Sequence, residues 1–150
     1  MIREFRCDPD SVHGPEHWRR VERNGLLLAT RTGAIVEVVR LFAVFHDARR
    51  EHDDWDDRHG AAGAAYAASF RGVLFDLPDP QFDRLRYACV WHTHGRLSKD
   101  PTIGTCWDAD RLDLGRVGMA PRAAYLSTAF ARNIAAQGSV EKFMKETGVD

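Results

Sequence analysis

Segment 34–45 is the part of this sequence that most restricts what the chain can fold into. It is apolar apart from Glu37 and Arg40, which stand three positions apart. The run is longer than a typical strand, and its two charges have a helical spacing. We therefore interpret it as a helix buried in the core of a domain. Its β-branched residues keep a strand open as the alternative.

Patterns on both sides of this segment predict further helices. An apolar stripe at helical spacing follows Pro15, and the alanine-rich stretch 60–71 offers Ala61, Ala64, Ala65 and Ala68 as a packing face. No full strand shows alternation of period two. We expect an all-α, single-domain bundle of about six or seven helices. The expected helices cover 15–30, 34–45, 60–71, 82–92, 106–116 and 121–135, with a loop over 95–105 and a last helix capped by Ser139.

Length and composition exclude several classes of protein. A chain of 150 residues fits one domain, with a core over about 11–135 and a C-terminal helix over 139–148 that packs on it or on a partner, which leaves a homodimer open. No apolar run approaches the ~20 residues of a membrane span. A net charge of −1 argues against binding to extended nucleic acid. The charged N-terminus and the widely spaced cysteines favour a cytoplasmic protein.

Histidine and aspartate are placed where several expected helices begin or end. His17 lies in the first turn of one helix, and His46-Asp47 directly follows the apolar segment. A charged aspartate at that point is costly unless it is paired or bound to a cation. The remaining candidates are His59, His92, His94, Asp108 and Asp110. Imidazole and carboxylate together suit a divalent ion such as Mn, Fe, Co, Ni, Zn or Mg.

Each of these residues also has a simpler interpretation. His46 could interact with a helix dipole, His59 could cap a helix, and Asp108 and Asp110 could belong to an ion-paired helix face. The ordered set favours a metal site. His92 and His94 stand two positions apart, so a regular helix would direct them to different sides. We expect His92 to face the site, His94 to lie in a loop, and His13 and His52 to be solvated.

The order of these residues resembles the HD-domain superfamily of metal-dependent phosphohydrolases. The resemblance lies in His17-x-x-Arg20-Val21, in Phe45-His46-Asp47 after an apolar helix, and in the run from Asp108 to Asp113. It implies an all-α bundle that holds one divalent ion per chain through His17, His46, Asp47 and Asp110, with Asp108 as the fallback for the last ligand. His59 and His92 fall where binuclear members place two further histidines. They imply either a second ion bridged by Asp47 or contacts to substrate phosphate.

The same resemblance implies hydrolysis of a small phosphorylated substrate, such as a nucleotide, by a metal-activated water. Arg20, Arg49 and Arg50 would supply guanidinium groups for phosphate. Well-known subgroups place an acidic residue three positions after the HD aspartate, where this chain has Arg50. Glu51 is the substitute that we consider for the general acid, with Asp53, Asp54 and Asp57 as further choices. Two alternatives are an HD-type di-iron oxygenase and a non-catalytic metal or nucleotide sensor.

Overall fold

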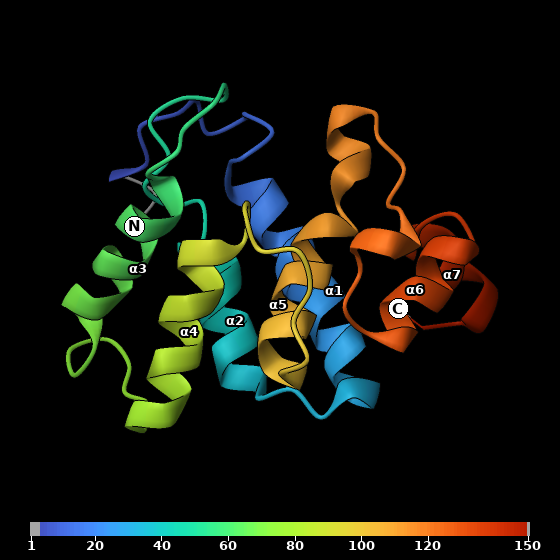
Figure 1. The fold of residues 1–150 in the computed structure, drawn as a ribbon. Helices are drawn as coiled ribbons and strands as arrows, with labels where there is room; N and C mark the ends of the chain where they lie inside the picture. Colours follow the sequence, from blue (N-terminus) through green and yellow to red (C-terminus); the bar gives the residue numbers. More distant parts are fainter. Residues whose placement is uncertain (1–3, 150) are drawn as a thin grey trace.

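The structure is a computed structural model that describes residues 4–149. Its regular elements are all helical, and its only strand-like feature within this range is an isolated bridge between Arg71 and Phe75. This confirms the predicted all-α class (Figure 1). None of these helices is long and apolar enough to cross a membrane. The elements are α1 (Pro15–Thr32), α2 (Val36–Phe45), α3 (His59–Phe70), α4 (Asp79–Trp91), α5 (Pro101–Arg111), the short 3-10 helices η2 (Leu114–Val117) and η3 (Ala123–Tyr125), α6 (Ala129–Ala136) and α7 (Val140–Thr147).

Helix α2 forms the centre of the core. It packs against α1, α3, α4 and α5, and the side chains of Val38, Val39 and Phe42 are fully buried. The apolar segment is therefore a helix, and the strand alternative is wrong. Because neighbours cover α2 on several sides, its C-terminal end is held in the interior, where a polar residue needs partners.

Two glycines bring α3 close to its neighbours. A Cβ atom on Gly63 would collide with the backbone carbonyl of Phe45 at the end of α2, and one on Gly60 would collide with that of Cys89 in α4. The predicted alanine face of this helix is only partly correct. Ala64 is buried, but Gly60, Gly63 and Ala67 complete the packed face, and Ala61, Ala65 and Ala68 are exposed. The start of α3 is thereby held against the ends of α2 and α4.

The second half of the chain differs from its predicted boundaries. Helix α5 begins at Pro101, inside the predicted loop 95–105, because Oδ1 of Asp100 accepts hydrogen bonds from the Thr102 and Ile103 amides. It ends at Arg111, short of the predicted end. The predicted helix 121–135 is replaced by η3 and α6. Helix α6 starts only after Thr128, whose hydroxyl caps it.

The C-terminal helix α7 packs on the rest of the bundle. Ser139 caps it as predicted, and Val140 and Phe143 are buried. The ring of Phe143 meets that of Phe130 in α6 edge to face, with centroids 5.6 Å apart. Helices α6 and α7 lie to one side of the bundle in Figure 1. The sequence left two positions open for this helix, on the core or on a partner. In the structure the helix packs on the core of its own chain.

Candidate metal centre

Five helices bring their ends together at one end of the bundle. The first turn of α1 carries His17, and His46 and Asp47 follow α2. His59 is the first residue of α3, and His92 directly follows α4. The last turn of α5 adds Asp110. All four histidines and Asp47 are buried, so the helices create a polar cluster inside an otherwise apolar core.

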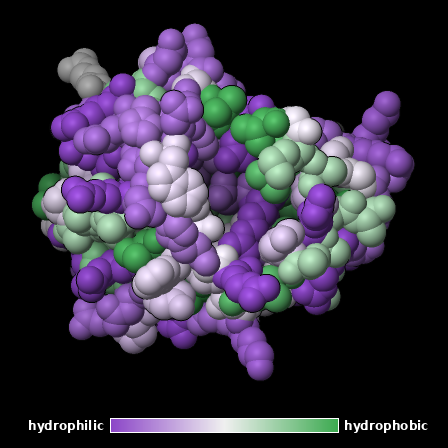
Figure 2. Space-filling view, turned by 45° about the horizontal axis from the view of Figure 1, so that its top comes forward, coloured by the Kyte–Doolittle hydropathy of each residue, from purple (hydrophilic) through white to green (hydrophobic). Residues whose placement is uncertain are grey.

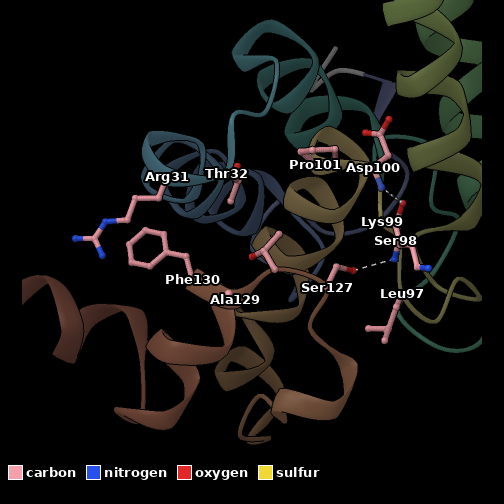
Figure 3. A pocket seen from close by; sticks show the side chains of 11 residues that line it. Arg31, Thr32, Leu97, Ser98, Lys99, Asp100, Pro101, Ser127, Ala129 and Phe130 are labelled. Carbon is pink, nitrogen blue, oxygen red and sulfur yellow. Dashed lines mark hydrogen bonds between the residues drawn. The ribbon is translucent and has the colours of Figure 1, made fainter.

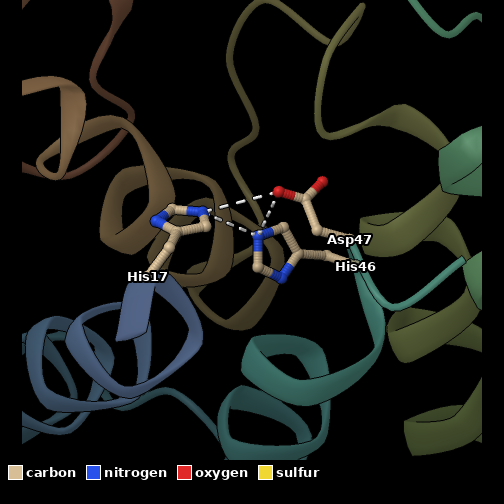
Figure 4. A group of neighbouring side chains, drawn as sticks. All are labelled: His17, His46 and Asp47. Atoms are coloured by element: carbon tan, nitrogen blue, oxygen red, sulfur yellow. Dashed lines mark hydrogen bonds and ion pairs between the residues drawn. The ribbon is translucent and has the colours of Figure 1, made fainter. Parts of the chain in front are cut away.

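The first part of this cluster is formed by His17, His46 and Asp110 around one oxygen of Asp47, and we call it the His17 half. The Nε2 atoms of His17 and His46 are 3.1 Å apart. Oδ2 of Asp47 lies 3.6 Å from the first and 3.5 Å from the second (Figure 4). Oδ1 of Asp110 lies 3.1 Å from Nε2 of His17 and 3.7 Å from that of His46.

The second part, the His59 half, repeats this arrangement on the other oxygen of Asp47. The Nε2 atoms of His59 and His92 are 2.9 Å apart. Oδ1 of Asp47 lies 3.3 Å from the first and 3.4 Å from the second. Each oxygen of Asp47 therefore serves one pair of histidines, and the two groups around it, His17-His46-Asp47 and Asp47-His59-His92, could each hold a metal ion.

The outer ring nitrogen of each histidine already has an acceptor. Nδ1 lies within hydrogen-bonding distance of Asp113 Oδ2 in His17, of the Phe42 carbonyl in His46, of the Asp56 carbonyl in His59 and of the Cys89 carbonyl in His92. A neutral imidazole that donates from Nδ1 has a lone pair on Nε2. Two facing lone pairs cannot form a hydrogen bond with each other. A cation, either a proton or a metal ion, is needed in each half.

The pKa shifts within the cluster also differ between the two histidines of each half. Burial lowers the pKa of His46 to about 4. Burial by itself would lower the pKa of His17, but hydrogen bonds to Asp110 and Asp113 outweigh burial and raise this pKa. Burial and the neighbouring His92 lower the pKa of His59, whereas Asp47 raises that of His92 against the effect of burial. Each pair thus favours one positive charge and disfavours two.

The carboxylates show that the donor set suits a divalent cation. Oδ1 of Asp110 is buried, and its nearest polar neighbours among residues 4–149 are the charged or titratable nitrogens of His17, His46 and Arg116. Although burial opposes it, nearby His46 holds the pKa of Asp47 well below its usual value, and His17 does the same for Asp110. Ionised carboxylates among imidazole lone pairs are the ligands that borderline and hard divalent ions prefer. A metal ion would bind the Asp110 oxygen together with the Nε2 atoms that face it.

Arg50 is the only predicted arginine that reaches the cluster. It is buried, and its Nη1 atom lies 3.0 Å from Nδ1 and 3.1 Å from Nε2 of His59. Its Nη2 donates to the Asp54 carbonyl at 3.1 Å. Its Nε is buried without a partner among the described residues. A fixed positive charge therefore borders the His59 half.

Three other predicted residues lie outside the cluster. Nε of Arg20 donates to Asp113 behind His17. The guanidinium of Arg49 lies over the ring of Tyr66, 5.1 Å from its centroid. Glu51 is exposed and pairs with Arg6 at 2.8 Å. None of the three contacts the four histidines, and their predicted roles toward a substrate stay predictions.

Asp108, the predicted fallback ligand, has a different role. Its Oδ1 accepts a hydrogen bond from the Ser127 amide, and its Oδ2 accepts from the amide and hydroxyl of Thr128. Both oxygens are therefore used to hold the chain at the start of α6. Residues two apart on a helix point to different sides, so Asp110 faces the cluster while Asp108 faces away.

Sequence reasoning missed three neighbours of the cluster. His13 was expected to be solvated, but its Nδ1 lies 3.1 Å from Oδ2 of Asp47, so that prediction is wrong. Asp113 contacts His17, and Arg116 has Nη2 3.7 Å from Oδ1 of Asp110. The spacing of three from Asp110 to Asp113 to Arg116 was a visible signal for one helical face. The exposed positions of His52 and of His94, which pairs with Asp57, agree with prediction.

A cavity of about 480 Å³ lies beside the His59 half. Thr93 lines it, and Oγ1 of Thr93 is 3.4 Å from Nε2 of His59. Figure 2 shows this end of the molecule, with a hollow that has a hydrophilic floor and hydrophobic side chains along one rim. The walls of the cavity combine arginines with apolar groups, among them Arg96, Arg111, Met119, Arg122 and Tyr125.

A second cavity, of about 530 Å³, lies at the starts of α5 and α6. Figure 3 shows the guanidinium of Arg31 over the ring of Phe130, 4.4 Å from its centroid, and the Ser98 amide donating to the hydroxyl of Ser127. Its carboxylate, Asp100, caps α5. The polar groups here are used to hold two helices, and the histidine cluster remains the better candidate for chemistry.

No family model, no curated protein and no solved structure matches this chain.

Proposed function

We propose that the protein is a metal-dependent phosphohydrolase of the HD type, acting on a small phosphorylated metabolite such as a nucleotide. The observation that carries this proposal is the pair of facing Nε2 atoms on each side of Asp47, 3.1 Å apart in one half and 2.9 Å in the other. A divalent ion held there would activate a water molecule and polarise a phosphoryl oxygen.

The residues around the cluster would bind and orient the substrate. Arg50 places a guanidinium at the edge of the His59 half, where it can meet a phosphate oxygen. Arg96 and Arg122 line the adjoining cavity, and neither guanidinium has an acidic partner within residues 4–149. Tyr125 adds a half-exposed ring for an apolar part of the substrate. Charge and shape together favour a small anionic molecule.

We further propose two ions per chain instead of the single ion expected from the sequence. Each half has its own pair of histidines, and Asp47 supplies one oxygen to each. Arg50 lies so close to His59 that the second ion has to compete with its charge. The His17 half would therefore fill first.

The same ligand arrangement favours a second candidate, a di-iron oxygenase. Four histidines around a shared carboxylate could hold two metal ions, and a two-metal site can serve redox chemistry as well as hydrolysis. The phosphohydrolase is preferred because arginines border the cluster and its cavity. A sensor that binds but does not turn over would use the same ligands.

Metal analysis followed by an activity screen tests these proposals. The protein is stripped with a chelator, reloaded separately with Mn²⁺, Co²⁺, Ni²⁺, Zn²⁺, Mg²⁺ or Fe²⁺, and analysed for bound metal. It is then assayed for phosphate release from nucleoside monophosphates and p-nitrophenyl phosphate. We expect metal-dependent release, lost in His46→Ala and retained in His52→Ala, whose histidine is exposed.

Failure to bind any of these metals would contradict the metal centre. Oxygen consumption by the iron-loaded protein, without phosphate release, would instead support the oxygenase. Metal binding with neither activity across the substrate panel would support the sensor. Once a metal is bound, each outcome of the activity assays therefore selects one of the three functions.

A further inference from the structure

His17 differs from the other three histidines in the group that holds its outer nitrogen. The other three Nδ1 atoms lie against backbone carbonyls, which no substitution removes. Nδ1 of His17 instead lies 2.7 Å from Oδ2 of Asp113, a side chain that is only 7% exposed. One histidine of the cluster therefore depends on a side chain for its orientation.

Asp113 is held in turn by a residue closer to the surface. Nε of Arg20 donates to its Oδ1 at 2.8 Å, and Arg20 lies about one turn after His17 on α1. Asp113 follows α5, three positions after Asp110. Contacts thus run from Arg20 through Asp113 to His17, and both oxygens of the carboxylate are used.

A carboxylate behind an imidazole has a defined effect on the other ring nitrogen. It keeps the proton on Nδ1, fixes the plane of the ring, and makes Nε2 a stronger donor to a cation. Nε2 of His17 is the atom that faces His46 and Asp110. Asp113 is therefore placed to control the donor atom without itself reaching the cation position.

We propose that Asp113 is a positioning residue that fixes the tautomer of His17 and directs its Nε2 lone pair at the cation position of the His17 half, with Arg20 holding Asp113 in place. This inference rests on the proposed metal centre but not on the reaction it catalyses. A purely structural role, in which Asp113 only ties α1 to α5, is the alternative that an experiment has to separate.

The test compares Asp113→Asn with the matched control Asp108→Asn. Both replace a buried carboxylate at the end of α5 by its isosteric amide, but Asp108 accepts only from Ser127 and Thr128. Zn²⁺ affinity is measured by competition with a chelator. Ring ¹⁵N NMR of His17, at a pH above its titration, reports the tautomer in the metal-free and Zn²⁺-loaded proteins.

We expect Asp113→Asn to weaken Zn²⁺ binding at the His17 half by about 10- to 100-fold. The His17 spectrum should change from the Nδ1–H tautomer to a mixture, because an amide can donate as well as accept. Asp108→Asn should lower thermal stability without changing either readout. Arg20→Gln, on the partly exposed side chain, should keep the fold and give a smaller loss of affinity, under about tenfold.

An Asp113→Asn protein with the parent's Zn²⁺ affinity and the parent's His17 tautomer would overturn the proposal. So would an equal loss of affinity in Asp108→Asn, because that would reveal a general effect of destabilisation. If Asp113→Asn does not fold, Arg20→Gln decides with the same two readouts. A parent protein that binds no Zn²⁺ would refute the metal centre, while the metal-free spectrum would still decide whether Asp113 fixes the tautomer.

Discussion

The two halves of the histidine cluster have nearly the same donor geometry but different charged neighbours. Each has two Nε2 atoms about 3 Å apart and one oxygen of Asp47. Around the His17 half stand two further carboxylates, Asp110 against the ligand atoms and Asp113 behind His17. The His59 half has the guanidinium of Arg50 instead. If both halves bind a cation as proposed, we expect the charges behind the donor atoms to decide which half binds it more tightly.

Removing the shared carboxylate should have the largest effect, because it acts on both halves. Asp47→Ala should lower the stoichiometry of tightly bound Co²⁺ to near zero, with affinity reduced by more than about 100-fold at each half. The reason is that each oxygen of Asp47 faces one pair of histidines. Equilibrium dialysis with elemental analysis measures this, and His52→Ala serves as the control. Retention of one ion at the parent's affinity would show that the halves do not share this ligand.

Asp110→Asn should weaken metal binding at the His17 half only. Only the His17 half contains Asp110, whose Oδ1 lies 3.1 Å from Nε2 of His17. We expect about 10- to 100-fold weaker binding at one of two sites and little change at the other, measured by calorimetric titration with Mn²⁺. Asp108→Asn is the matched control on the same helix. Equal weakening at both sites would contradict the division described above.

Replacing Arg50 should strengthen metal binding, in contrast to the two substitutions above. Arg50→Gln removes a positive charge 3.0 Å from the His59 ring, and we expect the weaker metal site to tighten by roughly tenfold, or about 1.4 kcal/mol. The stronger site should hardly change. Titration of Mn²⁺ into the variant and into Arg49→Gln, whose guanidinium packs on Tyr66, measures the difference. Weaker binding in Arg50→Gln would mean that Arg50 organises the site instead of opposing the ion.

Metal affinity should also rise with pH. The change per pH unit is the smallest effect that we expect. The pKa values of His17 and His92 are raised from 6.5, so a proton competes with a metal ion for each pair of histidines more strongly than it does at an ordinary imidazole. Lowering the pH through this range strengthens the proton's competition, so affinity falls on acidification, by less than about tenfold per pH unit at each site. Zn²⁺ competition titrations at several pH values give the slope, and a flat profile above 6.5 would contradict it.

Part of this arrangement could be predicted from the sequence because it depends on local pattern. The apolar run of α2 predicted a buried helix, and the polar pair His46-Asp47 at its end indicated a buried cation site. His59 and His92 were expected near that pair from the resemblance to binuclear HD proteins, and the structure groups both of them with Asp47. Helix ends can be predicted to meet when the helices between them are short and antiparallel.

The remainder depends on contacts between segments that are distant in sequence. Asp108 and Asp110 could not be ranked securely until the fold showed that Ser127 and Thr128 occupy the first of them. Nothing local marks His13 as a neighbour of Asp47, because the turn before α1 sets its direction. Helix α5 was predicted too late because its cap, Asp100, lies in a stretch that resembles a loop by composition.

The two glycines of α3 restrict how far this helix can move relative to the ends of α2 and α4. Gly63 lies against the carbonyl of Phe45 and Gly60 against that of Cys89, so even a methyl group would act as a wedge between backbones. His59 is the residue immediately before this contact. The separation between the His59 ring and its neighbours is thus set by direct contact of main chains, which do not adjust as side-chain rotamers do. The spacing within the histidine cluster therefore depends on the lack of a side chain at Gly60 and Gly63, two positions outside the cluster itself.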